Sequence, residues 1–146
     1  MLKHGTTYVP TLIAPYLIAK QGAKNPVSWY DSAKAEALLK VHREGLTKAY
    51  RAGVPIGVGT DLGTPFNDPG SLVLEMEHLV EAGMTLTDVL RGATSVAARL
   101  LRYDDELGTL ESNKLADVVV LEGNPWEDLS ALRRVRAVFK GGQRLV

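Results

Sequence analysis

Charges balance in this chain of 146 residues, with 17 Lys and Arg against 17 Asp and Glu. A neutral chain without a basic cluster gives no electrostatic reason to expect nucleic acid or an anionic membrane as a partner. The absence of cysteine excludes disulfides, thiol nucleophiles and cysteine-based zinc sites. The cytoplasm is only the default compartment, because an export signal can precede the first residue.

The first expected element is a strand over residues 6–12, a run of β-branched and aromatic residues. Residues 14–28 are expected to form a loop, because Pro15, Gly22 and Pro26 interrupt any regular pattern. Loops of this length in compact domains usually have a function. The apolar run near the start of the chain is too short to span a bilayer.

A helix is expected over residues 31–52, with Asp31 or Ser32 as its N-cap and Gly53 as its stop signal. A short apolar strand over residues 55–60 follows it. Helix and strand thus alternate in this part of the chain, which favours an α/β architecture with parallel strands.

Two further helices are expected over residues 71–82 and 87–101, the second capped by Thr85 or Thr87. From residue 104 the pattern changes to short apolar runs separated by Gly, Asn and Pro, which indicates a small β-structure. The expected strands of this second region cover residues 107–110, 118–121, 135–139 and 143–146.

Two polar residues of the second region have structural interpretations. Asp117 stands in an apolar strand. A structural carboxylate whose hydrogen bonds are satisfied is a better interpretation there than a catalytic group. Asn113 stands just before Lys114, and Asn is the non-glycine residue that best tolerates a left-handed turn.

The strand over residues 55–60 ends in a single carboxylate, Asp61. In a (β/α)8 barrel, a residue just past the C-terminal end of a strand points into the active site. An Asp before Gly-Thr-Pro is also ordinary turn composition, so Asp61 can simply cap the turn that follows. Both interpretations stay open on the strand alone.

The order of several short stretches resembles the C-terminal part of the metal-dependent amidohydrolase superfamily. The matching stretches are residues 52–61, 81–85, 91–94 with 97–98, 107–109, 114–120, 123–125 and 138–141. Residues 5–12 look like the seventh barrel strand of the subgroup that includes imidazolonepropionase-like and Xaa-Pro or Xaa-Arg dipeptidase-like members. The resemblance extends from about Val41 to the end of the chain.

This resemblance implies a fold class: α/β, the C-terminal fragment of a (β/α)8 barrel followed by part of a small β-sandwich. Residues 1–103 would supply the last two barrel strands with their helices, and residues 104–146 the C-terminal part of the composite sandwich. A whole barrel needs about 250 residues, more than this chain has. We therefore expect a truncated gene product or a fragment of a longer protein.

The resemblance also implies a chemistry, in which one or two divalent ions, commonly zinc, activate a water against an amide carbonyl. A carboxylate after the last barrel strand binds metal and accepts a proton, and Asp61 matches that position, as both metal ligand and catalytic base. Thr11, Leu62 and Thr64 follow the expected strands and are candidates for substrate contacts. The remaining family ligands cannot be placed in this sequence.

None of the three histidines is expected to bind metal. His4 precedes the first strand, at the end of a barrel away from the active site. His42 lies in a predicted outer helix, where a structural role is expected. His78 stands among Glu75, Glu77 and Glu81 on a helix, which is typical of a solvated face.

The expected function is therefore that of part of a hydrolase acting on carbon–nitrogen bonds in a peptide or cyclic amide. This chain alone is expected to be inactive. The expected partners are a small-molecule or short-peptide substrate and the missing N-terminal part of the same protein, or a second copy. The alternative is a non-catalytic subunit or interaction module that completes a split barrel.

Overall fold

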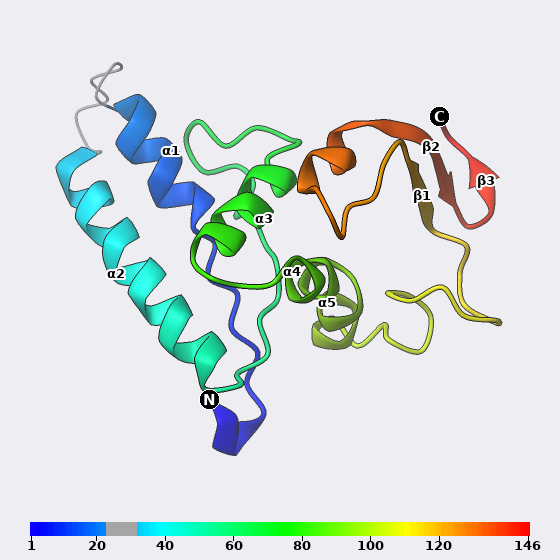
Figure 1. Cartoon of the computed structure of the whole chain (residues 1–146), viewed down its shortest axis with the longest axis horizontal. Coiled ribbons are helices and arrows are strands. Elements are labelled where there is room, and N and C mark those ends of the chain that lie inside the picture. Colours follow the sequence, from blue (N-terminus) through cyan, green and yellow to red (C-terminus); the bar gives the residue numbers. More distant parts are fainter. Residues whose placement is uncertain (23–31) are drawn as a thin grey trace.

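The computed structural model describes residues 1–22 and 32–146, and Figure 1 shows a group of helices beside a small sheet. The elements of the N-terminal half are the 3-10 turn η1 (Leu2–His4) and the helices α1 (Ile13–Gly22), α2 (Ser32–Arg51), α3 (Leu72–Glu81), α4 (Leu86–Ala93) and α5 (Ser95–Leu100). The C-terminal part contains β1 (Val118–Leu121), η2 (Leu129–Arg133), β2 (Val135–Lys140) and β3 (Gln143–Arg144). No helix in the described ranges has the length and apolarity needed to cross a membrane.

Two extended segments run parallel through the helical part and meet at one bridge, between Tyr8 and Ile56. The Tyr8 amide donates to the Pro55 carbonyl at 2.9 Å, and the Gly57 amide donates to the Tyr8 carbonyl at 2.9 Å. The expected strands 6–12 and 55–60 are therefore adjacent and parallel, but each is reduced to this single bridge. Within the described residues neither segment has a strand on its outer edge, which explains why the ladder stays short.

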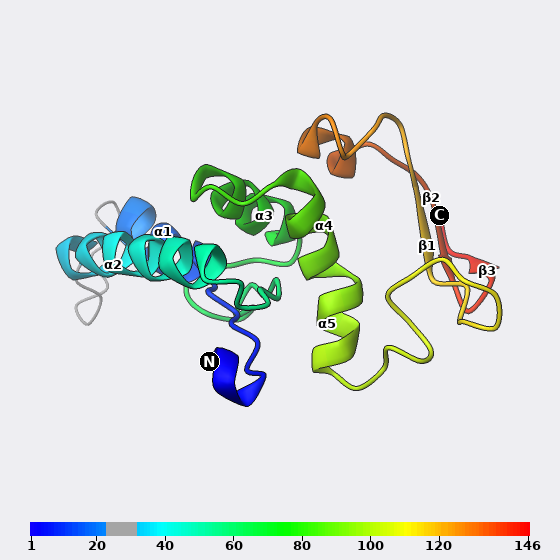
Figure 2. The same ribbon diagram turned by 60° about the horizontal axis from the view of Figure 1, so that its bottom comes forward.

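The loop expected over residues 14–28 is wrong for its described part, because α1 begins at Ile13. Pro15 stands in the first helical turn, where its missing N–H costs nothing and its fixed φ suits a helix. The remainder of that loop, and Asp31 as a possible cap, lie outside the described residues. Helix α1 packs beside α2, as Figures 1 and 2 both show.

Helices α2 and α3 confirm the prediction, whereas the single helix expected over residues 87–101 is wrong. Thr94 breaks it into α4 and α5, with φ −125° and ψ −93°. The Thr94 hydroxyl donates to the Leu90 carbonyl at 2.8 Å, a local bond that competes with the regular helical pattern. The Thr85 cap is confirmed, since its hydroxyl accepts from the Asp88 amide at 3.1 Å.

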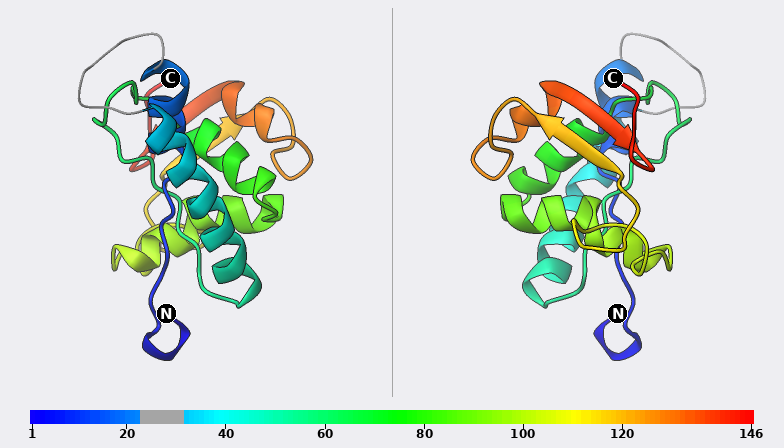
Figure 3. Two further views of the ribbon diagram at one scale, coloured as in Figure 1. Left: turned by 90° about the vertical axis from the view of Figure 1, so that its left-hand side faces the viewer. Right: turned by 90° about the vertical axis from the view of Figure 1, so that its right-hand side faces the viewer.

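The C-terminal sheet is antiparallel in the order β1-β2-β3, and it stands in front of the helices in the right-hand view of Figure 3. The strand expected over residues 107–110 is wrong: this stretch is irregular and is held by the Lys114 ammonium, which donates to Thr109 Oγ1 at 2.6 Å. Asn113 has φ 70°, as its turn requires. Asp117 is structural, because its carboxylate accepts from the Gly141 amide at 2.7 Å.

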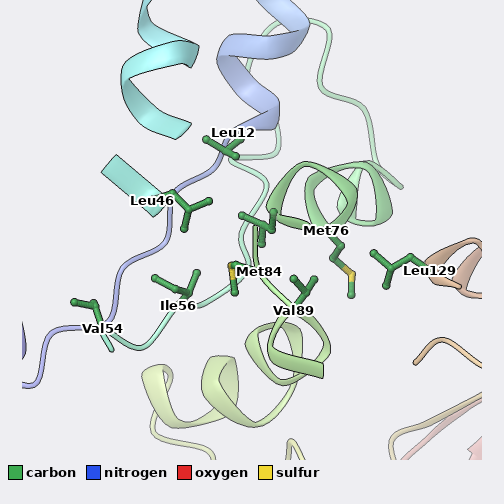
Figure 4. Close-up of a cluster of buried hydrophobic side chains, with 9 residues drawn as sticks. Leu12, Leu46, Val54, Ile56, Met76, Met84, Val89 and Leu129 are labelled. Atoms are coloured by element: carbon green, nitrogen blue, oxygen red, sulfur yellow. The ribbon is translucent and has the colours of Figure 1, made fainter. Parts of the chain in front are cut away.

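One apolar cluster joins the extended segments, the helices and the C-terminal region, and Figure 4 shows its side chains around a common interior. Its buried members are Leu12, Leu46, Val54, Ile56, Met76, Leu79, Met84, Val89 and Leu129. Leu129 comes from η2, and the neighbouring Arg133 forms a two-pronged ion pair with Glu77 of α3, at 2.5 and 2.9 Å. The C-terminal region is thus anchored to α3 by apolar burial and by charge.

A buried carboxylate connects α3 to the start of α1. Glu75 has no exposed surface, and its two oxygens accept from the amides of Leu12 at 3.0 Å and Ile13 at 2.7 Å. Burial raises the pKa of Glu75 to about 7, although the two amide bonds oppose the shift. The sequence placed this residue on a solvated face, and that placement is wrong.

The raised pKa of Glu75 predicts a pH-dependent stability. Between about pH 4.5 and pH 7 the folded protein keeps a proton that the unfolded chain has lost, so raising the pH favours unfolding. We expect the urea midpoint of the folded protein to fall from about pH 5 to about pH 8. Glu75→Gln removes the titration and should flatten this slope, whereas an equal slope in both proteins contradicts the expectation.

A second prediction concerns the contact between α4 and the segment before Asp61. A Cβ on Gly92 would lie 2.9 Å from the Ile56 carbonyl oxygen and 3.0 Å from a Val58 methyl. Because backbone cannot move aside cheaply, Gly92→Ala should cost about 1–3 kcal/mol in chemical denaturation. Gly45→Ala is the control, since a Cβ there meets nothing and should not destabilise the protein.

Candidate active site

The two extended segments end at one open cleft of about 460 Å³. Thr11 and Asp61, the residues at the ends of these segments, both line it, together with Thr64 from the following loop. Helices α1 and α2 supply further walls, including Ile18 and Leu38. The structure therefore brings together three of the four predicted site residues. Leu62 is not among the lining residues and is 59% exposed.

Both segment ends have left-handed backbone, although neither residue is glycine. Thr11 has φ 49° and Asp61 has φ 53°. Such a conformation is uncommon for non-glycine residues, and a β-branched Thr is a clear outlier. Each outlier costs about 1–3 kcal/mol and persists only where the surrounding structure enforces it, which is frequent at functional sites.

Asn67 enforces the turn at Asp61. This side chain is 3% exposed, and its Nδ2 donates to the Thr60 carbonyl, to the Asp61 carbonyl at 3.2 Å and to Thr64 Oγ1 at 3.3 Å. The Thr64 hydroxyl also donates to the Asp61 carbonyl, at 3.0 Å. These hydrogen bonds hold the turn through the backbone carbonyl of Asp61. Within the described residues no hydrogen bond engages the Asp61 carboxylate.

Glu75 holds the other end, because the two amides that it accepts from directly follow Thr11. Sequence reasoning missed both Asn67 and Glu75. A signal for Glu75 was present: it shares a helical face with Leu72, Met76 and Leu79 by its spacing, and Met76 and Leu79 are buried. The run of acidic neighbours concealed it. For Asn67 the sequence offers only ordinary loop composition.

The histidines lie in three different environments. His4 is exposed in η1, as expected. His42 lines the cleft from α2, and its Nδ1 is buried without a partner among the described residues. His78 is only 4% exposed, so the expected solvated face is wrong: its Nδ1 lies 3.1 Å from Glu81 and its ring contacts Tyr16.

Two side chains of metal-ligating type, Asp61 and His42, are among the residues that line the cleft. Across residues 1–22 and 32–146, no three His, Cys, Asp or Glu side chains form a group able to hold an ion. Asp61 is exposed and lines the cleft, and within the described residues its carboxylate makes no hydrogen bond or ion pair. Thr11 and Thr64, which carry neutral hydroxyls, line the same cleft.

Known proteins with similar sequences include an ochratoxinase and imidazolonepropionases. The ochratoxinase of Aspergillus niger is 33% identical over 150 residues, an alignment covering 98% of this chain and 30% of that protein. The imidazolonepropionase of Thermoplasma acidophilum is 32% identical over 81 residues, covering 55% of this chain and 20% of that protein. The chain thus spans about a third or less of the length of these relatives.

Solved structures similar to this chain include a Xaa-Pro dipeptidase and an ochratoxinase. A Xaa-Pro dipeptidase with methionine bound in its active site superposes with a TM-score of 0.84 and 36% identity, over 99% of this chain and 35% of that one. The A. niger ochratoxinase structure superposes with a TM-score of 0.79 and 31% identity, over 97% of this chain and 32% of that one. The Amidohydrolase family profile matches residues 1–145, so the chain belongs to the amidohydrolase family.

Proposed function

We propose that this chain is the C-terminal part of a metal-dependent hydrolase of carbon–nitrogen bonds, with Asp61 as metal ligand and general base. Its family and its relatives support a hydrolase of such bonds. The observation that carries the role of Asp61 is the unengaged carboxylate at the end of a parallel segment, on a turn that Asn67 holds without it.

The fold part of this proposal assigns residues 1–103 to the end of a (β/α)8 barrel and residues 104–146 to part of a β-sandwich. Support comes from the parallel bridge between Tyr8 and Ile56, with helices connecting the two segments. Parallel strands joined through helices are usually covered on both faces and paired on both edges. The additional strands would come from the rest of a longer protein or from a partner chain.

The chemistry follows from the properties of a carboxylate beside a metal site. A divalent ion, with zinc as the expected one, would lower the pKa of a water toward neutrality when bound with Asp61 as one of its ligands. The Asp61 carboxylate would accept a proton from the attacking water while the water oxygen bonds to the substrate carbonyl carbon. When the carbon–nitrogen bond breaks, Asp61 would return this proton to the leaving nitrogen.

The cleft suits a small amide substrate. Its walls from α1 and α2 include the apolar Ala14, Ile18 and Leu38, which favour an apolar substituent on the substrate. The Thr11 and Thr64 hydroxyls are the proposed polar contacts. The similarity to a Xaa-Pro dipeptidase and to an imidazolonepropionase favours a peptide or a cyclic amide.

A non-catalytic role is the second candidate, favoured because the described residues include no group of three side chains able to hold a metal ion. In that case the chain completes a barrel whose other ligands lie on a separate protein. The two candidates differ in whether the remaining strands lie in the same reading frame, which the coding DNA upstream of Met1 distinguishes.

The first prediction here concerns Asp61→Asn, tested in the active protein that includes this chain. Asn tolerates the left-handed backbone and keeps one acceptor oxygen, but it cannot take the proton. We expect kcat to fall by about 10²-fold or more, with little change in thermal stability. Asp68→Asn, in the same loop and also exposed, is the matched control and should keep near-normal activity. Retention of more than about a tenth of wild-type kcat by Asp61→Asn contradicts the assignment.

Metal removal supplies the second prediction. A chelator should abolish the activity of the complete protein, and added zinc should restore it. The 146-residue chain by itself should retain no stoichiometric zinc after desalting, because one carboxylate cannot hold a divalent ion against water. Elemental analysis that finds about one ion per isolated chain would overturn this assignment of ligands.

A further inference from the structure

Burying the Glu75 carboxylate is unfavourable, and both of its hydrogen bonds go to neighbouring amides at the start of α1. The carboxylate lies on α3, more than sixty positions from the residues it contacts, and it has no exposed surface. Its oxygens accept from the Leu12 and Ile13 amides at 3.0 and 2.7 Å. Buried amides must find acceptors, so this arrangement fixes the backbone immediately after Thr11.

We infer that Glu75 is a positioning residue for the substrate cleft, which acts by holding Thr11 in its left-handed conformation. The inference rests on the proposed function, since it is there that the cleft is assigned to the substrate. Thr11 lines the cleft, and so do Ala14 and Pro15 in the first turn of α1. Fixing the amides of Leu12 and Ile13 therefore sets the position of a continuous part of the cleft wall.

The other segment end supports this interpretation independently. Asp61 has the same left-handed backbone as Thr11, and it too is held by a buried polar side chain, Asn67. The amides that Glu75 binds lie at the start of α1, so the carboxylate caps this helix and at the same time fixes the backbone directly after Thr11. We call Glu75 and Asn67 the clamps of the two segment ends, because each is a buried polar side chain that bonds to the backbone at or directly after the strained residue. Two strained ends that are both clamped and both line one cleft indicate that their geometry matters for what binds there.

The effect on catalysis should fall on substrate binding more than on chemistry. Glu75→Gln keeps the size of the side chain but places an amide group, with its own N–H donors, opposite one of the two backbone N–H groups. The backbone after Thr11 should then relax and shift this part of the cleft wall. Asp61 remains in place on the other segment, so the proton transfer is retained.

The test uses the active protein that includes this chain and four variants: Glu75→Gln, Thr11→Gly, the double variant and Glu77→Gln. Glu77 is the matched control because it also lies on α3 and also accepts two hydrogen bonds, from Arg133. We expect Glu75→Gln to raise KM about tenfold and to change kcat less than about threefold. Glu77→Gln should leave KM unchanged.

Thr11→Gly provides a background that distinguishes a positioning role of Glu75 from a purely structural one, because only a positioning role makes the effect of Glu75→Gln on KM depend on residue 11. Glycine adopts the left-handed conformation without strain, so the clamp becomes partly redundant. In the glycine background, Glu75→Gln should raise KM by no more than about threefold. Independent, multiplicative effects of the two changes would overturn the inference.

Hydrogen exchange separates this inference from the proposed function, because it requires no activity. The Leu12 and Ile13 amides should exchange at least about tenfold faster in Glu75→Gln than in Glu77→Gln. Unchanged exchange or an unchanged KM in an active enzyme overturns the clamp, whereas a wild-type protein without hydrolase activity overturns only the proposed function. If Glu75→Gln fails to fold, recovery of folded protein by Thr11→Gly supports the clamp, and no recovery contradicts it.

Discussion

The parallel pairing of the Tyr8 and Ile56 segments is the constraint on which the rest of the structure depends. Parallel neighbours end on the same side, so this pairing brings Thr11 and Asp61, fifty positions apart in sequence, to one cleft. The pairing needs a long connection, which α1 and α2 provide, and these helices form the walls of the same cleft. The site thus follows from topology before any side chain is considered.

Packing and hydrogen bonding then fix the ends of the paired segments. The apolar cluster around Ile56 and Leu12 holds the segments themselves, while Glu75 and Asn67 hold the strained residues beyond them. Burying a carboxylate opposes stability at neutral pH, as the raised pKa of Glu75 indicates. Such a cost is consistent with a conformation maintained for binding, since the most stable version of this fold would not need it.

The sequence predicted the α/β content, α2, α3 and the central C-terminal strands, because each has a clear period or a clear stop signal. The prediction from sequence failed where one residue type is compatible with two local structures, or where a residue gave no signal. Pro15 was interpreted as a helix breaker although the first turn tolerates it, and Thr94 carried no visible signal for the break between α4 and α5. The position of Asp61 after an apolar run predicted its place at the end of a parallel segment, where it lines the cleft. Its clamp, and that of Thr11, depend on contacts between distant or irregular segments that no local pattern encodes.

The role of Asp61 as a metal ligand is the central claim, and anomalous diffraction from crystals of the complete protein tests it most directly. Data collected on both sides of the zinc absorption edge locate the ion without reference to activity. We expect an anomalous peak about 2.0–2.2 Å from an Asp61 carboxylate oxygen, at the cleft that Thr11 and Thr64 also line. A fully ligated ion located away from Asp61, with this carboxylate turned to solvent, would contradict it.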